Sequence, residues 1–592
     1  MWKVEPNPPV WPKSVKLIKD TDDMLQVYEI LKESEDTWDD VSKCYTGDQH
    51  FSKRRLAFLF APGIYKNLHF EVGYYVQVIG LGNSPDQVFF SSGPHVPALN
   101  KQLNQHGSSL DTFWRGAENF CTHDLLWAVS QAAPLRRVHV KSNLYLSDGP
   151  AYASGGFMAN CQVDGTTFFG SQQQWLSRNC SFGKGYCGGA WSLVILGCVD
   201  LGEGSNQGNF MEAVTTEIPR TPVRIEKPYI ILKEDGIQYE LRVPLASRET
   251  THQCGCNFDS ANEVVRDFSR VFVADPDNPV VNIQIQDALE SGKDVILAPG
   301  IFHLDKTLRM LYPNQVLLGL GFATLVAPPD GSPCISVLPK LGGVRIAGIM
   351  LEASMRIGNS VSVTSLLEWG SESENDSGDA NNPGGLFDIF CRVGGDTEGD
   401  RNRYFLDVIM RIHSGHVIGD NIWLWRADHA KLLSGEAPNY LPIPKYHQTE
   451  ETEYKVKNGI HLNGDDICMY GLAVEHMNEH QVLWNGERGQ TYFYQCELPY
   501  DVSHYSFGQK GYTGYLVEET VTSHLLVAPG VYSNFRNEIC PVQTAIKHPE
   551  MKDIVVVKPF TVKLDNYGHI QSIINGNGKP ATATGIPSRL ET

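Results

Sequence analysis

The sequence predicts an all-β protein made of two tandem solenoids. An internal repeat, a composition rich in turn residues and the length of the chain all lead to this fold class. The 592 residues would fill about four ordinary domains of ~150 residues, whereas a solenoid can be long because each coil packs only on its neighbours. Gly (55) and Pro (33) are frequent and charged residues make up only 20% of the chain. This composition favours short strands joined by turns.

The repeat begins near residues 57 and 294. The first copy reads AFLFAPGIYKNLHFEVGYYVQVIGLG and the second reads DVILAPGIFHLDKTLRMLYPNQVLLGLG. Each copy predicts a short buried strand, a Pro-Gly turn, a second strand and a third strand that ends in Gly-Leu-Gly. A weaker echo between residues 111–119 and 420–429 supports a duplication.

The repeat divides the chain into successive parts. We expect a first solenoid over residues 1–230, a connector over 231–264, a second solenoid over 265–570 with the main catalytic residues, and a loosely ordered tail over 571–592. Residues 21–34 predict a helix, since Asp22 and Asp23 precede a run of apolar residues. This helix is expected to cap the open end of the first solenoid. Residues 371–385 and 433–455 are expected to be long surface loops, which either wall a binding cleft or decorate the surface.

The charge and the cysteines exclude several classes of function. A net charge of −19 repels phosphate backbones, so we expect no nucleic-acid partner, and a neutral polysaccharide is compatible with it. The sequence has no apolar run of ~18 residues, so no membrane span is expected. The first residues contain no apolar signal region, so the chain is either intracellular or begins near a mature start. Cys254-Gly-Cys256 is too short for a usual zinc pair and Asp465-Asp466 offers too few oxygens for calcium, so no metal or cofactor is expected.

Residues 471–505 are the most promising place for chemistry. The segment reads GLAVEHMNEHQVLWNGERGQTYFYQCELPYDVSHY, in which acidic and aromatic residues are interleaved. Glu475 and Glu497 are 22 residues apart, roughly one coil, so they would stack on adjacent strands ~4.8 Å apart. Two carboxylates this close raise one pKa and create a general acid near neutral pH. The alternative is that both glutamates are simply exposed on a strand surface.

The same residues carry a family resemblance. Val474-Glu475-His476, Trp484-Asn485-Gly486 and the run YFYQCELPYD over residues 492–501 resemble the active-site coils of the family 55 glycoside hydrolases. The resemblance covers nearly the whole chain. It implies two tandem right-handed parallel β-helices, pectin-lyase-like solenoids lying side by side, with a binding cleft between them. It also implies an extracellular, monomeric exo-β-1,3-glucanase that inverts the anomeric centre, with Glu497 as the general acid and Glu475 as the carboxylate that tunes and orients it.

Further site residues follow from the resemblance. The attacking water would be held by neutral groups of the first helix, for which Gln173, Gln174 and Ser192 are the candidates. The glutamine run also fits a stacked amide ladder on a solenoid face. The expected substrate contacts are Trp425, Asp428, His429, His476, Trp484, Tyr494, Tyr500 and Asp501. Arg426 is more simply interpreted as an ion-pair partner of Asp428 that shapes a loop.

Two other functions remain open from the residues alone. A polysaccharide lyase uses a β-helix too, but it needs cations to neutralise a uronate, and the acidic cluster around Glu497 argues against such a substrate. A non-catalytic carbohydrate-binding or structural solenoid would tolerate the loss of Glu497. We predict instead that Glu497→Gln abolishes turnover while binding is largely preserved.

Overall fold

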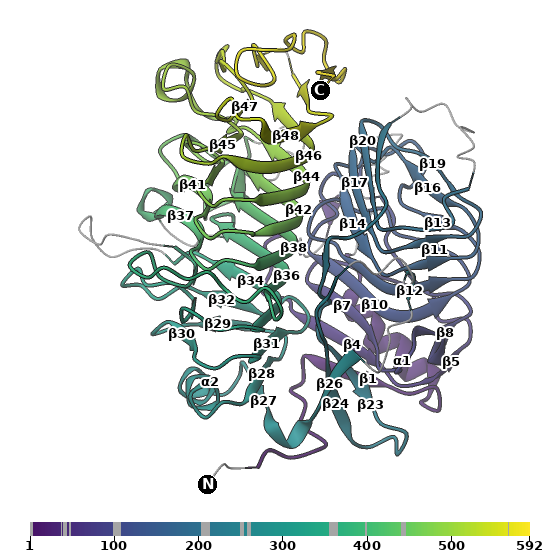
Figure 1. Cartoon of the computed structure of the whole chain (residues 1–592). Coiled ribbons are helices and arrows are strands. Elements are labelled where there is room, and N and C mark those ends of the chain that lie inside the picture. The colour runs from purple at the N-terminus through teal and green to yellow at the C-terminus, as the bar shows by residue number, and fades with distance from the viewer. Residues whose placement is uncertain are drawn as a thin grey trace. The chain divides into compact units, whose positions relative to one another are not determined.

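The computed structural model describes residues 4–36, 38–39, 44–45, 49–98, 108–202, 213–248, 254–256, 262–354, 365–396, 400–439, 446–565 and 567–591. The chain forms two compact units. The first comprises Met1–Ile301 and Val316–Ala323, and the second comprises Phe302–Gln315 and Thr324–Thr592. In each unit short parallel strands are stacked coil upon coil, as the sequence predicts (Figure 1).

The first unit is built on one long sheet. Its order is β1 (Val15–Ile18), β4 (Leu56–Phe60), β7 (Val76–Gly80), β10 (Arg115–Thr122), β12 (Leu135–Val140), β14 (Gly156–Ala159), β17 (Gln174–Arg178), β20 (Ser192–Leu196) and β21 (Val214–Ile218). A second face is formed by β11 (Leu125–Leu126), β13 (Leu144–Tyr145), β16 (Thr167–Gly170) and β19 (Tyr186–Gly188). Shorter pairs complete the coils, namely β5 (Gly63–Tyr65) with β8 (Val88–Phe90), β15 (Gln162–Val163) with β18 (Ser181–Phe182), and β6 (Phe70–Glu71) with β9 (Pro94–His95). The antiparallel pair β2 (Trp38–Asp39) and β3 (Cys44–Tyr45) lies outside the stack.

The predicted capping helix is present. Helix α1 spans Met24–Leu31 and continues as a 3-10 turn over Lys32–Ser34. Asp23 caps it, because its side chain accepts a hydrogen bond from the Leu25 amide at 2.9 Å. Val27 and Leu31 are buried in the same apolar core as the strand residues Phe58 and Val78. The helix therefore shields the core of the first solenoid from water.

A column of left-handed residues bends the strands between faces. In the first unit the strand register aligns Asn119, Arg137, Asn160, Asn179 and Gly197, with φ between +52° and +62°. The second unit repeats the column with Gly348, Asp388, Asn421, Gly471, Phe493 and Ala528, with φ between +50° and +81°. Asn, Asp and Gly tolerate this conformation better than other residues, which explains why they occupy eight of these eleven positions.

The described parts of the predicted connector take part in antiparallel strands. β23 (Tyr229–Leu232), β24 (Tyr239–Pro244) and β26 (Glu263–Asp267) form a small sheet, and β22 (Val223–Arg224) pairs with β25 (Ser247–Arg248). The second copy of the repeat follows, with β27 (Val271–Ala274), β28 (Asp294–Leu297) and β31 (Val316–Gly319) clustering with the first unit. The boundary between the two compact units therefore lies further along the chain than the predicted connector. Helix α2 (Val281–Glu290), which the sequence analysis missed, buries Val281, Ile285 and Leu289 beside β27 and β28.

The repeated sequence forms the predicted strands in both copies, with one additional short strand in each. The Pro-Gly turn at residues 62–63 joins β4 to β5, and the one at 299–300 joins β28 to β29 (Ile301–His303). The strands that end in this glycine, β7 and β31, are the fourth of each copy, after β6 and β30 (Leu308–Met310), and they end at Gly80 and Gly319.

The second unit has two long parallel faces. One contains β34 (Arg345–Glu352), β36 (Gly384–Val393), β38 (Val417–Arg426), β42 (Cys468–Glu475), β44 (Gly489–Glu497), β46 (Ser523–Ser533) and β49 (Phe560–Lys563), flanked by β32 (Thr324–Val326) and β48 (Asp553–Val557). The other contains β30 (Leu308–Met310), β33 (Ile335–Val337), β35 (Leu367–Trp369), β37 (Phe405–Ile412), β41 (Lys455–Leu462), β43 (Val482–Trp484), β45 (Tyr515–Val517) and β47 (Ile546–Lys547). β39 (His429–Lys431) and β40 (Tyr446–Gln448) form an antiparallel pair beside the stack.

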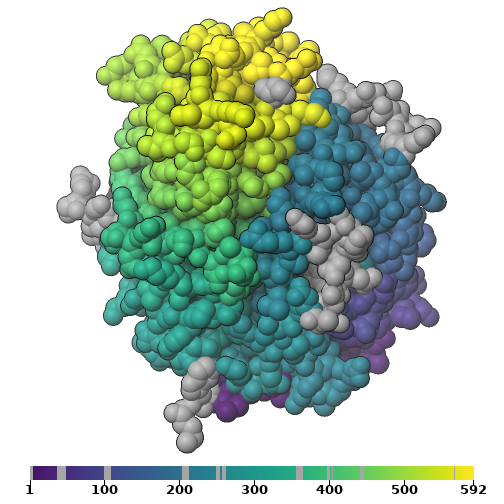
Figure 2. Space-filling view, viewed as in Figure 1, coloured from purple at the N-terminus to yellow at the C-terminus, as the bar shows by residue number. Residues whose placement is uncertain are grey.

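The last residues pack against the second solenoid, contrary to the expectation of a loose tail. β50 (Ser588–Arg589) pairs antiparallel with β49, and Ile570, Ile573 and Ile574 are buried. The yellow C-terminal residues accordingly form a continuous surface with the preceding coils (Figure 2). Burial of Ile573 and Ile574 anchors the start of the segment that was expected to be loose.

Two further expectations concern loops and membranes. Residues 371–383 form an irregular loop with turns, and residues 384–385 already belong to β36. The Asp376 carboxylate organises this loop by accepting hydrogen bonds from the amides of Lys340 at 2.7 Å and Gly378 at 3.0 Å. Residues 440–445 of the other predicted loop lie outside the described residues. Within the described part of the chain, no helix is long and apolar enough to cross a membrane.

Candidate active site

Successive coils of the second unit bring one residue each into a single column. The register aligns Glu352, Arg392, Trp425, Glu475, Glu497 and Tyr532. Ala473 on β42 pairs with Gln495 on β44, so Glu475 and Glu497, two residues further on, are neighbours. The His476 amide donates to the Glu497 carbonyl at 2.9 Å, which continues this pairing. The predicted spacing of one coil between the two glutamates is confirmed.

Glu497 is set up to hold a proton. Its side chain is half-buried, and the hydroxyl of Tyr500 donates a hydrogen bond to Oε2. Burial raises the pKa of Glu497 to about 8, the negative charge of Asp428 acts in the same direction, and the positive charge of Arg536 opposes both. A carboxyl group with this pKa is protonated at neutral pH, so it can donate its proton to a bound molecule.

Asp428 supplies the charge that acts on Glu497. It is buried, and its Oδ1 lies 2.9 Å from His429 Nδ1 while its Oδ2 accepts from Arg536 Nη2 at 2.6 Å. Burial by itself acts to raise the pKa of Asp428, but the charges of His429 and Arg536 and the hydrogen bond from His429 outweigh it and hold this pKa well below its usual range. Asp428 therefore stays ionised beside a protonated Glu497.

The structure adds a second carboxylate to the predicted pair. The sequence analysis gave the tuning role to Glu475, which stays a prediction, and the charge of Asp428 also raises the pKa of Glu497. Glu475 is buried and accepts a hydrogen bond from Trp423 Nε1 at 2.8 Å. Its side chain thereby contacts the preceding coil, where Trp423 lies on β38.

Arg536 is the functional residue that the sequence analysis missed. It follows β46, 39 residues after Glu497, and no motif marks it. Its Nη1 donates to the Asp428 carbonyl at 2.9 Å, its amide donates to the Tyr500 carbonyl at 2.8 Å, and its guanidinium stacks 4.8 Å from the centre of the Tyr500 ring. Arg536 thus fixes both groups that flank Glu497.

Other predicted contacts gather around the same point. The ring of His476 meets the Tyr500 ring edge-on, with centroids 4.4 Å apart, and burial lowers the pKa of His476 to about 4, so it is neutral at pH 7. The His429 ring packs against Trp425 with centroids 5.4 Å apart. These side chains surround the carboxyl groups of Asp428 and Glu497.

Three predicted substrate contacts prove to be interior residues. Trp484 is fully buried, and its Nε1 donates to the Gly486 carbonyl at 3.0 Å. Tyr494 is also fully buried, and its hydroxyl donates to the Gly514 carbonyl. Asp501 is buried in an ion pair with Arg426, so the predicted Arg426–Asp428 pair is wrong. Strand alternation points Trp484 and Tyr494 into the coil, where a sugar cannot reach them.

The predicted water-holding residues lie in the first unit. Gln174 on β17 is the register partner of Ser192 on β20, and the Ser192 amide donates to the Gln173 carbonyl at 3.0 Å. Gln174 and Ser192 are buried and Gln173 is half-buried. An amide and a hydroxyl therefore lie side by side on neighbouring strands, and their role with water stays a prediction.

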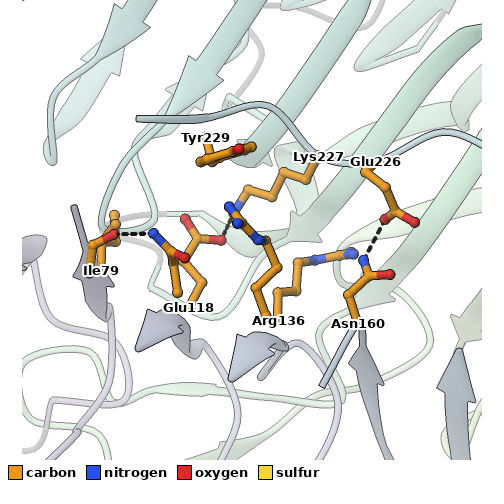
Figure 3. A pocket seen from close by; sticks show the side chains of 10 residues that line it. Ile79, Glu118, Arg136, Asn160, Glu226, Lys227 and Tyr229 are labelled. Atoms are coloured by element: carbon orange, nitrogen blue, oxygen red, sulfur yellow. Dashed lines mark hydrogen bonds and ion pairs between the residues drawn. The ribbon is translucent and has the colours of Figure 1, made fainter. Parts of the chain in front are cut away.

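A small pocket in the first unit has a different character. Glu118, Arg136, Asn160, Glu226 and Lys227 line it together with Tyr229 (Figure 3). Lys227 Nζ lies 2.9 Å from Glu118 Oε2, and Arg178 binds Glu226 with two hydrogen bonds of 2.7 and 2.9 Å. The charge of Arg178 helps to hold the pKa of Glu226 far below its usual range despite burial. These pairs fasten residues 226–229 to the solenoid, and Glu226 has no proton to donate.

Two features define the class of this protein. It is a β-helical stack, and it carries the protonated, partly exposed carboxyl group of Glu497 among aromatic rings. Both are typical of the carbohydrate-active β-helix enzymes. The LAM55 pectate lyase-like domain model matches residues 271–497. A curated exo-beta-1,3-glucanase from Streptomyces sp. (strain SirexAA-E / ActE) is 33% identical over 552 residues, covering 91% of this chain and 84% of the relative. The chain belongs to the family 55 glycoside hydrolases.

Solved structures agree with this assignment. The structure of sacteLam55A from Streptomyces sp. SirexAA-E superposes with a TM-score of 0.84 at 30% identity, covering 99% of each chain. A glutamate-to-alanine variant of the same protein in complex with glucose gives a TM-score of 0.82 at 28% identity, covering 100% of this chain and 99% of the other.

Proposed function

We propose that this protein hydrolyses β-1,3-glucan, that it acts from the chain end and inverts the anomeric centre, and that Glu497 is its general acid. The observation that carries the proposal is the pKa of about 8 at a half-buried carboxyl group in a member of this family. Cleavage of a glycosidic bond needs an acid that protonates the leaving oxygen. A glutamate with an ordinary pKa of 4.5 is ~99% ionised at pH 7, whereas one with a pKa of about 8 is ~90% protonated.

The hydrogen bond from Tyr500 orients this proton. Because the Tyr500 hydroxyl donates to Oε2 of Glu497, the carboxyl proton belongs on Oε1, which is left to face the glycosidic oxygen. As the bond to the anomeric carbon breaks, the proton moves from Oε1 to the departing oxygen and Glu497 becomes a carboxylate. The Arg536 charge, which favours the ionised form of Glu497, stabilises this product state.

Asp428 is unsuited to act as the base. Both of its carboxylate oxygens are engaged, one near His429 and one by Arg536, and its low pKa makes it a weak proton acceptor. We therefore assign the attacking water to neutral groups, with Gln173, Gln174 and Ser192 as the proposed candidates. Trp425, His429, His476 and Tyr500 are the proposed sugar contacts.

The decisive experiment combines a product assay with one substitution. Laminarin is incubated with the wild-type protein, and the anomeric protons of the released sugar are followed by NMR before mutarotation. We expect glucose of α configuration, and we expect Glu497→Gln to lower kcat by ~10²–10⁴-fold. Glu519→Gln, an exposed glutamate of the same unit, is the matched control and should keep full activity. A normal rate for Glu497→Gln would remove the mechanism.

The same reaction mixtures test the lyase alternative. A lyase leaves an unsaturated sugar that absorbs in the ultraviolet, whereas hydrolysis leaves none. We expect no rise in absorbance with laminarin or with a uronate polymer. We also propose that the protein acts outside the cell, where a polysaccharide substrate is met, and that it is a monomer. Light scattering at micromolar concentration checks the monomer.

A further inference from the structure

Three residues of different chemical types meet on the first solenoid, in the part of the molecule that the proposed function does not use. Asp86 lies in the 3-10 turn Pro85–Gln87, Cys121 lies on β10 and His139 lies on β12. One potential ligand atom from each lies within 4.8 Å of the other two. Cys121 and His139 are register partners on adjacent parallel strands, so the coil geometry itself holds them together.

We propose that Asp86, Cys121 and His139 form a binding site for a divalent transition metal, with Zn²⁺ the ion that suits it best. A thiolate, an imidazole and a carboxylate are the side chains that zinc selects, and three of them leave a fourth tetrahedral position for water. On binding, the Cys121 thiol releases its proton to solvent and the sulfur bonds to the metal. The thiolate and the Asp86 carboxylate then balance the charge of the ion.

The surroundings of His139 fit a metal ligand. His139 Nδ1 faces Asp86 Oδ1 at 2.7 Å, and Nε2 lies 3.0 Å from Asp164 Oδ2 on the other side of the ring. Asp164 is itself held by Gln162 Nε2 at 2.9 Å. Histidines that bind metals usually donate their second ring N–H to a carboxylate, which fixes the tautomer. A bound ion would take the place of the proton between Nδ1 of His139 and Asp86, while Asp164 continues to hold Nε2.

Exposure and charge are compatible with ion entry. Cys121 and His139 are buried, whereas the Asp86 side chain is 44% exposed and provides a route from solvent. Lys141 Nζ lies 3.1 Å from Asp86 Oδ1 and competes with a cation for this carboxylate. Since the Lys141 side chain is 41% exposed, it can swing into water when the ion arrives. Lys141 should therefore weaken metal binding without preventing it.

The sequence analysis expected no zinc because it looked at Cys254-Gly-Cys256. The structure brings the proposed ligands from three separate segments, which no sequence spacing reveals. Cys256 is nevertheless close, since its Sγ lies 3.7 Å from Gln162 Oε1 and Gln162 is the register partner of His139. A disulfide between Cys121 and Cys256 is thus the competing chemistry that the test must detect.

The test uses the full-length protein after treatment with a chelator. Co²⁺ is titrated in, and we expect a thiolate-to-cobalt charge-transfer band that Zn²⁺ removes by displacement. Cys121→Ser should abolish the band, and Asp164→Asn should weaken binding by ~10–100-fold although it removes no ligand. Lys141→Met should tighten binding. Cys187→Ser, a buried cysteine elsewhere in the same unit, is the matched control and should leave the titration unchanged.

Laminarin hydrolysis reports that each variant is folded, because none of these residues belongs to the proposed catalytic site. Absence of the band in the wild-type protein, or its persistence in Cys121→Ser, would overturn the proposal. Mass spectrometry of a non-reducing digest that joins Cys121 to Cys256 would overturn it too, because the thiol would then be consumed.

Discussion

Replacing Asp428 by asparagine should move the alkaline limb of the pH–rate profile. The substitution keeps the size of the side chain and an oxygen for Arg536, but it removes the negative charge that helps to raise the pKa of Glu497 to about 8. With the opposing Arg536 charge still present, the pKa of Glu497 must fall. A partly buried neighbouring charge typically changes a pKa by ~1–2, so we expect a limb near pH ~6–7 in the variant.

The magnitude follows from the protonated fraction. At pH 7 the acid is ~90% protonated with a pKa of about 8 and ~10–50% protonated in the variant, which predicts a loss of roughly two- to tenfold in kcat/KM. At pH 5 both forms are almost fully protonated and the rates should nearly agree. The assay is kcat/KM on a short β-1,3-glucan oligosaccharide from pH 4 to 9, with Glu519→Gln as the control.

A second substitution tests the direction in which each neighbouring charge shifts the pKa of Glu497. Arg536 lowers the pKa of Glu497, so Arg536→Gln should move the alkaline limb upward while Asp428→Asn moves it downward. Equal loss of activity at pH 5 and pH 7 in Asp428→Asn, with the limb unmoved, would refute the electrostatic reasoning and leave Asp428 a purely structural role.

The remaining predictions concern stability. The pKa of Glu497 is higher in the folded state than in the unfolded state, so folding stability falls as the pH rises from 4.5 through 8, and the loss is complete above pH 8. Glu497→Gln should therefore raise Tm relative to wild type at pH 9 but not at pH 4. Trp423→Phe removes the indole donor to the buried Glu475 and should lower the free energy of unfolding, measured with denaturant, by about 1–3 kcal/mol. An unchanged free energy of unfolding would refute this hydrogen bond. Leu31→Ala opens a cavity under the capping helix and should cost about 2–5 kcal/mol, whereas the exposed Leu25→Ala should cost little.

Much of the architecture follows from local sequence. A coil of a β-helix is a local unit, so the repeated Pro-Gly turns and terminal glycines predict its strands directly, and the 22-residue spacing places Glu475 beside Glu497. The capping helix is equally local, because Asp23 and the apolar residues behind it lie within three turns. The order of the C-terminal residues was not predictable in this way, since it depends on apolar surface that earlier coils present to Ile570, Ile573 and Ile574.

The sequence by itself thus determined the solenoid fold and the family, and it singled out Glu497 as the proposed acid. Only the tertiary structure decided what surrounds that acid. Asp428 and Arg536 are 69 and 39 residues from Glu497, and they meet it because loops of different coils converge at one face. Likewise, a shift of one residue along a strand exchanges the inner and outer faces, so an aromatic-rich sequence could not show that Trp484 and Tyr494 point into the core. Charges interact through space, and the fold sets both the distances between them and the exposure of each side chain.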